Sequence, residues 1–495
     1  MSSSSSTASA AVAAASSHEL PDCSYLSPPT LIKPLIPTPS HTLYLSNLDD
    51  QPFLRFTIKY LYLFSNPSSS ALPDPEALRA SLSKVLIDYY PLAGRLRRSP
   101  EDERKLEVDC NGEGAVFVEG AMEIRAEEFL GVYRKKPNRS WRKLLYRVDA
   151  RTFSDVPPLV VQVTKLQCGG MILCTAVNHC MCDGIGTSQF LHAWAHLTAN
   201  QNGSPPSPSP FHSRHVLRPR DPPQITSRIP LFTKPATRDN TYNLTLHLQS
   251  QPLVPVSVVI TPSLIARLKH RCSPPLKCTA FEATAAHTWR SWARSLGLPP
   301  ALISKLLFSV NVRRKLSPPL PEGFYGNGFV LACAECTVVD LVGGSENLHH
   351  GVRLVQQAKS AVTDDHVRSV VDYLETDRAA RPDLSSSLVI SEWSRLGLEN
   401  LDFGGGRAYH MGPVASDVYC LFLPVAGEAE SVTVMVSVPE NAAEKFEYYM
   451  SGGSLGDERE KENRANYGSH GAEVRGLLTC EYAANEITSL STTTN

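Results

Sequence analysis

Residues 201–235 are rich in proline and poor in apolar periodicity, and they divide the 495-residue chain into two halves. Proline fixes the backbone angle φ and has no amide hydrogen, so this stretch cannot continue a helix or a central strand. We therefore expect a long crossover linker at the surface. A chain of this length holds about two or three domains, and the linker predicts an N-terminal lobe over 31–200 and a C-terminal lobe over 236–450.

Both lobes mix two kinds of apolar periodicity. In the first lobe, alternating or continuous apolar runs predict strands at 53–64, 159–166 and 171–177, and leucines four residues apart predict a helix over 74–86. In the second lobe, the same patterns predict the strands 254–260, 306–312, 329–338, 387–390, 418–424 and 431–438 and the helices 263–271, 280–295, 348–361 and 440–450. Strands and helices that alternate in this way are typical of α/β lobes with mixed sheets.

The two ends differ from the lobes in composition. Residues 1–30 open on a serine- and alanine-rich lead, and residues 451–495 are polar. Neither end offers enough apolar surface to offset the entropy lost on ordering it, so we expect both to be disordered. The lead lacks the basic and apolar regions of a secretory signal, and the chain has no run of about 18 apolar residues. We therefore expect a cytoplasmic protein without a transmembrane segment.

The charges of the chain nearly cancel. Lysine and arginine total 48, aspartate and glutamate total 49, and the formal net charge is −1. Such a chain has no bulk field that attracts nucleic acid or an anionic membrane, and we expect neither as a partner. The 12 cysteines are too sparse for a disulfide scaffold, which suits a reducing compartment.

A polar cluster stands at the end of one predicted strand. The apolar run 171–177 leads into His179, and a short turn then brings Asp183 and Gly184 before a predicted helix. Strand ends are where α/β lobes hold their ligands, and a neutral imidazole there can take a proton from an alcohol or an amine. The alternative is a histidine whose ring is satisfied by the backbone of a turn.

The spacing of His179, Asp183 and Gly184 resembles the HxxxDG motif of the plant BAHD acyltransferases, which move acyl groups from coenzyme A thioesters to alcohols or amines. Other segments are similar to motifs of this family, in the same order along the chain: Tyr89–Leu96 (YYPLAGRL), Cys110–Gly114, Phe281–Arg290, Pro318–Asn327 and Asp402–Gly406 (DFGGG). The matches together cover roughly residues 31–450.

The resemblance implies two lobes of the chloramphenicol acetyltransferase type with a channel between them. His179 would lie midway along the channel and act as general base, so that the acceptor attacks the thioester directly and no acyl-enzyme forms. The resemblance also implies that acyl-CoA serves as co-substrate and that the protein needs no cofactor or metal of its own. We expect a monomer.

Two roles are open for Asp183. It could orient the imidazole, as the aspartate of a catalytic triad does. In the family, the corresponding aspartate instead turns away and pairs with an arginine of the second lobe, which here would be Arg313. We expect the second arrangement, in which Asp183, Gly184 and Arg313 maintain the architecture of the site.

The resemblance places the Asp402–Gly406 loop on the CoA side of the channel. We expect Asp402 to shape the loop, and Gly404 and Gly406 to let its backbone approach the substrate closely. Gly405 departs from the family pattern, because a tryptophan is usual at this position. At the acceptor end, Ser391 is the candidate for contact with the substrate.

Within the family, the segments 37–49 and 391–397 are similar to members that transfer hydroxycinnamoyl groups to ω-hydroxy fatty acids, fatty alcohols or polyamines. We therefore expect an O-acyltransferase that acts on an ω-hydroxy fatty acid or a fatty alcohol. Two alternatives stay open. One is N-acylation of a polyamine or another amine, and the other is a non-catalytic relative that modulates lipid elongation.

Overall fold

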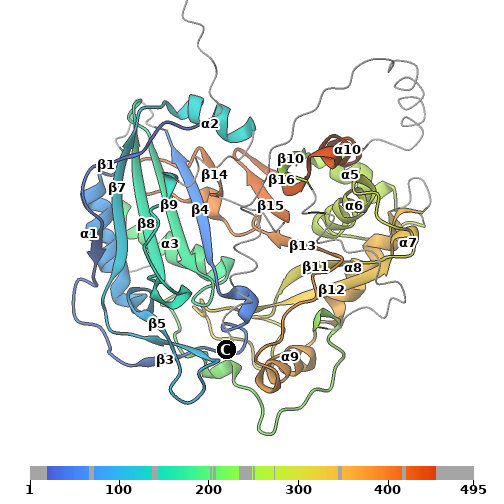
Figure 1. Cartoon of the computed structure of the whole chain (residues 1–495), viewed down its shortest axis with the longest axis horizontal. Coiled ribbons are helices and arrows are strands. Elements are labelled where there is room, and N and C mark those ends of the chain that lie inside the picture. The colour runs from blue at the N-terminus through green and yellow to red at the C-terminus, as the bar shows by residue number, and fades with distance from the viewer. Residues whose placement is uncertain are drawn as a thin grey trace, which may run out of the picture.

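The computed structural model describes residues 19–65, 72–135, 143–200, 203, 208–232, 248, 251–272, 274–343, 348–414 and 420–452. Within these residues the strands form a seven-stranded, a six-stranded and a three-stranded sheet. The two larger sheets occupy opposite sides of the molecule in Figure 1, and helices pack against each of them. This is the mixed α/β architecture that the alternating periodicities predict.

The first sheet has the strand order β1-β7-β8-β9-β4-β14, and β2 also pairs with β7. Its strands are β1 (Ser24–Tyr25), β2 (Thr30–Ile32), β4 (Thr57–Phe64), β7 (Ala115–Met122), β8 (Leu159–Leu166), β9 (Met171–Asn178) and β14 (His410–Pro413). Helices α1 (Pro75–Asp88) and α3 (Gly184–Ala199) cover one face, and α2 (Ala126–Lys135) covers the other. Because both faces are buried, the central strands are continuous apolar runs.

The second sheet has the order β10-β16-β15-β13-β11-β12 and combines parallel and antiparallel pairs. Its strands are β10 (Leu253–Ile260), β11 (Ile303–Asn311), β12 (Phe329–Thr337), β13 (Ser387–Glu392), β15 (Cys420–Val425) and β16 (Glu428–Pro439). The helices of this lobe are α5 (Pro262–His270), α6 (Ala280–Ser295), α7 (Val338–Val342), α8 (His349–Ala361), α9 (Asp364–Thr376) and α10 (Glu440–Met450). The small sheet joins β3 (Thr42–Tyr44), β6 (Leu106–Asp109) and β5 (Arg95–Arg98).

The expected disorder of residues 1–30 is wrong for the part that the structure describes. β1 pairs with β7 through Ser24 and Tyr25, and β2 pairs with β7 through Thr30–Ile32. These strands have only two and three residues, which is too short for a periodic apolar pattern in the sequence. They are recognised as strands only because they pair with β7. Residues 1–18 lie outside the described residues, as does nearly all of the expected tail over 451–495.

The crossover linker is not only a surface connection. Phe211 forms a bridge with Phe324 of the second lobe, and the side chains of Arg214 and Leu217 are buried. Part of the linker is therefore packed between the lobes.

The chain after β13 returns to the first lobe. β14 pairs antiparallel with β4, and the ring of Phe403 packs 5.0 Å from that of Trp194 on α3. The structure thus differs from the expected division, which assigned the Asp402–Gly406 loop to the C-terminal lobe over 236–450. The first lobe is therefore completed by a segment from the second half of the chain. None of the helices in the described part of the chain has the length and apolar character needed to span a bilayer.

Candidate active site

His179 directly follows a central strand. β9 is paired on both sides, with β8 and with β4, which fixes the point at which the strand ends. In the turn that follows, the amide of Met181 donates to the carbonyl of Asn178 at 2.9 Å, and the amide of His179 donates to the carbonyl of Phe56 at 2.9 Å. The turn is therefore closed by its own hydrogen bond, and the backbone of His179 is bonded to Phe56, the residue just before β4.

The imidazole of His179 lies between aromatic rings of both lobes. Its centroid is 5.3 Å from that of Phe56 and 5.9 Å from that of Phe329, on β12. Nδ1 is buried and has no hydrogen-bond partner among the residues that the structure describes, although the residue as a whole is partly exposed. The exposed surface of His179 therefore belongs to atoms other than Nδ1.

The electrostatic surroundings keep this imidazole uncharged. Burial lowers the pKa of His179 below its ordinary value of 6.5. An interaction of the ring with the backbone of His179 itself acts in the opposite direction, as do the carboxylate of Asp183, the side chain of Asn327 and the carboxylate of Asp49, but burial outweighs them. The ring is therefore neutral at pH 7, which is the state that accepts a proton.

The carboxylate of Asp183 is engaged by α3 and by the second lobe rather than by the imidazole. It forms a two-point ion pair with Arg313, at 2.8 and 2.9 Å. It also accepts from the backbone amides of Gly186 at 2.8 Å, which caps α3, and of Gly328 at 3.0 Å. These contacts are the pairing implied by the family resemblance, and they leave the triad-like alternative without a contact to support it.

Gly186 lets α3 approach the second lobe closely. A Cβ atom at this position would lie 1.8 Å from the carbonyl oxygen of Tyr325, and backbone cannot move aside as a side chain can. A Cβ at Gly184 would meet only the flexible end of Leu396, at 2.7 Å. The first turn of α3 is therefore a point of direct contact between the lobes.

The Asp402–Gly406 loop lies at the other end of α3. Asp402 accepts hydrogen bonds from the amides of Gly404 at 2.8 Å and Gly406 at 3.0 Å, and both glycines have positive φ angles, of 105° and 103°. Gly404 packs against Ala199, at the end of α3 opposite to His179. Because α3 has 16 residues and spans roughly 24 Å, the loop does not lie beside His179. Contact of Gly404 and Gly406 with substrate stays a prediction.

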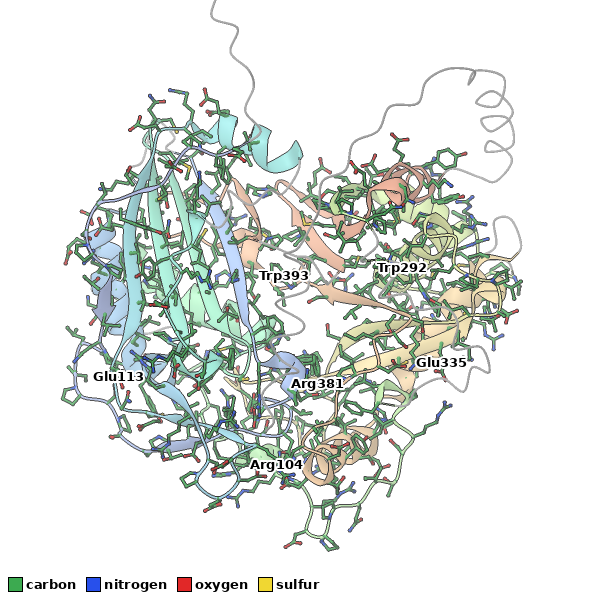
Figure 2. The ribbon with its side chains drawn as sticks, viewed as in Figure 1. Arg104, Glu113, Trp292, Glu335, Arg381 and Trp393 are labelled. Atoms are coloured by element: carbon green, nitrogen blue, oxygen red, sulfur yellow. The ribbon has the colours of Figure 1, made fainter. Side chains whose placement is uncertain are left out.

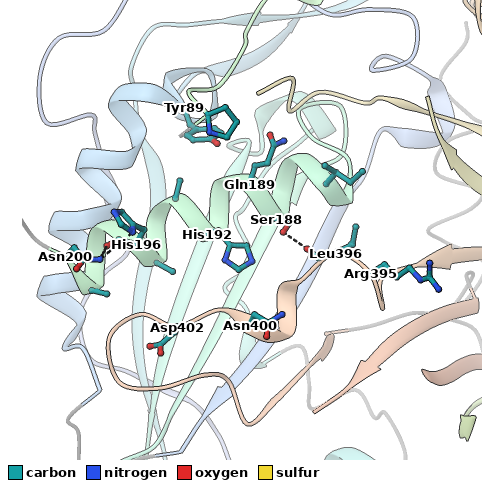
Figure 3. Close-up of a pocket in the computed structure, with 15 residues that line it drawn as sticks. Tyr89, Ser188, Gln189, His192, His196, Asn200, Arg395, Leu396, Asn400 and Asp402 are labelled. Atoms are coloured by element: carbon teal, nitrogen blue, oxygen red, sulfur yellow. Dashed lines mark hydrogen bonds between the residues drawn. The ribbon is translucent and has the colours of Figure 1, made fainter. Parts of the chain in front are cut away.

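A pocket of about 850 Å³ lies between α3 and the segment after β13 (Figure 3). α3 contributes His192 and His196 to its walls, and the segment contributes Asn400 and Asp402. Nε2 of His192 is hydrogen-bonded to the carbonyl of Gly397 at 3.0 Å, and this bond connects α3 to the segment after β13. His179 does not line this pocket, so the pocket is separate from the proposed place of reaction.

Ser391 lies on β13, close to the junction of the lobes. Its hydroxyl accepts a hydrogen bond from the indole of Trp393 at 3.1 Å, and the ring of Trp393 packs 4.7 Å from that of Tyr60 on β4. Figure 2 shows Trp393 between the two large sheets. Contact of Ser391 with the acceptor stays a prediction.

Three polar residues that the sequence did not single out lie around the His179 turn. The side-chain amide of Asn327 donates to the carbonyl of His179 at 2.7 Å and to Asp49 at 3.0 Å, and Arg214 donates to the carbonyl of Met181 at 3.1 Å. Asp49 and Asn327 belong to two segments, 37–49 and Pro318–Asn327, that resemble the family, but the resemblance assigns no role to either residue. Nothing local distinguishes them, because their partners are far away in the sequence.

The thiols beside His179 are packing groups. Burial raises the pKa of Cys180 and of Cys182, so both stay protonated at neutral pH and neither is an activated nucleophile. The described ranges also contain no group of histidine, cysteine, aspartate and glutamate side chains that could hold a metal ion.

Comparisons with known proteins identify the family of this chain. The model of the Transferase family matches residues 27–452. Omega-hydroxypalmitate O-feruloyl transferase of Arabidopsis thaliana is 37% identical over 428 residues, which cover 85% of this chain and 91% of that protein. Fatty alcohol:caffeoyl-CoA acyltransferase of the same plant is 36% identical over 426 residues, which cover 85% of this chain and 96% of that protein.

The fold also has a solved counterpart. The crystal structure of vinorine synthase is similar with a TM-score of 0.66 and 21% sequence identity, over 87% of this chain and 98% of that chain. At this identity the likeness concerns the fold. The family model and the two relatives extend over most of the chain, and they show that it belongs to the Transferase family, the BAHD acyl-CoA-dependent acyltransferases.

Proposed function

We propose that this protein transfers a hydroxycinnamoyl group from its CoA thioester to the hydroxyl group of an ω-hydroxy fatty acid or a fatty alcohol. The observation that carries the proposal is the placement of His179, a neutral and partly exposed imidazole where the two lobes meet. Relatives named for feruloyl transfer to ω-hydroxypalmitate and for caffeoyl-CoA transfer to fatty alcohols support this choice of donor and acceptor.

The proposed reaction is a direct displacement at the thioester carbon. His179 takes the hydroxyl proton as the acceptor oxygen forms a bond to the acyl carbon, giving a tetrahedral oxyanion. The carbon–sulfur bond then breaks, the carbonyl re-forms, and the imidazolium returns its proton to the departing CoA thiolate. We further propose that the two substrates reach His179 from opposite sides, through a channel between the lobes.

The function is tested by supplying the purified protein with feruloyl-CoA and caffeoyl-CoA, each paired with ω-hydroxypalmitate, a long-chain fatty alcohol, benzyl alcohol or spermidine. Release of CoA thiol and the mass of the product are measured. We expect ester products with the two long-chain acceptors, formed faster than the benzyl ester or any amide.

Two results would contradict the proposal in different ways. Faster formation of the spermidine amide would make the protein an N-acyltransferase. If no donor and acceptor pair released CoA above the protein-free rate, the protein would be a non-catalytic member of the family.

The pH dependence of kcat/KM reports the pKa of the general base in the free enzyme. Because burial lowers the pKa of His179 below 6.5, most of the imidazole is unprotonated at pH 7, and it takes up a proton and stops acting as a base only as the pH falls through a value below 6.5. We expect the acid limb of the kcat/KM profile to have its midpoint below pH 6.5. A midpoint above pH 6.5 would assign the limb to another group or to a solvated imidazole.

We also propose that the protein is cytoplasmic, that it is a monomer, and that it works without a cofactor beyond its acyl-CoA substrate.

A further inference from the structure

Asn327 connects His179 to the rest of the molecule from the opposite lobe. Its side chain is fully buried, in the loop between β11 and β12. Nδ2 donates to the carbonyl oxygen of His179 at 2.7 Å and to Oδ1 of Asp49 at 3.0 Å, and the amide of Asn327 donates to the same Oδ1 at 2.8 Å. A single side chain thus joins the second lobe, the loop after β3 and the turn after β9.

Asp49 is a rigid anchor for this side chain. It is fully buried, and its Oδ2 accepts hydrogen bonds from the amide of Ser46 at 3.0 Å and from the hydroxyl of Ser46 at 2.6 Å. The buried guanidinium of Arg214 lies 3.9 Å from Oδ2. A buried carboxylate with this many partners has little freedom to move, so it holds Asn327 in one orientation.

Two polar atoms of this cluster remain available. Nδ1 of His179 and Oδ1 of Asn327 are both buried and have no hydrogen-bond partner among the described residues. One can donate a hydrogen bond when protonated and the other can accept it. The backbone of His179 itself and, to a smaller extent, the Asn327 side chain raise the pKa of His179, as hydrogen-bond acceptors at the ring would. Catalytic hydrogen bonds that are long in the free enzyme commonly tighten when substrate binds.

We propose that Asn327, held by Asp49, is the residue that positions His179 for proton transfer. This inference rests on the proposed function. Asn327 fixes the backbone of His179 through its carbonyl and offers an acceptor to Nδ1–H, which keeps the proton on Nδ1 and leaves Nε2 free to act as base. Asp49 acts through Asn327 and is a positioning residue in the same sense.

The test uses Asn327→Ala, Asp49→Asn, the double variant and the control Asn47→Ala. Asn47 is buried in the same loop as Asp49 and donates to the carbonyl of Val371 at 2.8 Å, so its loss removes a comparable contact between the lobes without touching His179. We expect kcat to fall roughly 100-fold in Asn327→Ala, because a small misplacement of a reacting group costs that much. KM for both substrates should change little, and Asn47→Ala should keep the parental kcat.

Asp49→Asn replaces the carboxylate by an amide of nearly the same shape. It serves as the second test of the inference if Asn327→Ala does not fold. We expect it to lower kcat less than Asn327→Ala, and the double variant to be no slower than Asn327→Ala, because both residues act through one contact. Additive losses in the double variant, or parental kcat in a folded Asn327→Ala or Asp49→Asn protein, would overturn the inference.

The pH profile separates positioning from a structural effect. The charged groups around the cluster, Asp49, Asp183, Arg214 and Arg313, are unchanged in Asn327→Ala, so only the contribution of Asn327 is lost. Because that contribution raises the pKa of His179, the acid limb of kcat/KM should move to lower pH. If the acid limb did not move in Asn327→Ala, a direct interaction between Asn327 and the ring would be contradicted.

If His179→Ala kept parental turnover, the proposed function itself would fail. If His179→Ala were inactive while Asn327→Ala was not slowed, only the present inference would fail.

Discussion

Replacing His179 by alanine is expected to lower kcat/KM for acyl transfer by about 100-fold to 10,000-fold, the range in which a positioned general base contributes. The variant keeps the backbone contacts of the turn, because the amide of residue 179 still donates to the carbonyl of Phe56 and its carbonyl still accepts from Asn327. The fold should therefore survive, and the loss should lie in the chemical step.

Single-turnover measurements with a saturating acyl-CoA, together with thermal unfolding, test this expectation. The matched control is His366→Ala, which removes a largely buried histidine of α9 that bonds to Ser227 at 2.8 Å, away from the His179 turn. We expect the control to retain parental turnover. A His179→Ala protein that is folded and as fast as the parent would remove the proposed base from the mechanism.

The largest expected effect on stability comes from Arg313→Ala. The substitution leaves the carboxylate of Asp183, whose side chain is only 6% exposed, without its ion-pair partner. Breaking a buried ion pair by removing one member costs about 3–5 kcal/mol, because the remaining charge is desolvated and unpaired. We expect the free energy of unfolding in urea to fall by that amount, because only the backbone contacts between the start of α3 and the second lobe remain.

The control for this prediction is Arg104→Ala. Arg104 pairs with Asp102, but its side chain is 72% exposed, and an exposed pair contributes about 0–1 kcal/mol. If Arg313→Ala changed the free energy of unfolding no more than Arg104→Ala does, the Asp183–Arg313 pair would not hold the lobes together.

The local elements around His179 could be predicted because their signals lie within a few residues of each other. β9 is an apolar run that ends in polar residues, and Asp183 caps α3 by accepting from the amide three residues on. The pairing of Asp183 with Arg313 was expected only because the motifs of a family mark both residues. No local pattern links positions that are 130 residues apart.

Other features lay beyond any local pattern. β14 has four residues, and only the free edge of β4 decides that it joins the first sheet. Asp49 and Asn327 are 278 residues apart, and each is unremarkable until the fold buries both beside His179. Their role follows from desolvation, because a buried carboxylate and amide must find partners that the sequence does not identify.

The family, the two mixed α/β lobes and the strand, turn and helix that carry His179 could be predicted from residues that lie close together in the chain, because periodicity, capping and motif spacing act over short stretches. The lobe to which the chain after β13 belongs, and the buried groups that surround the imidazole, could be identified only in the folded molecule. Both depend on packing and hydrogen bonding between segments that meet only after the chain has folded.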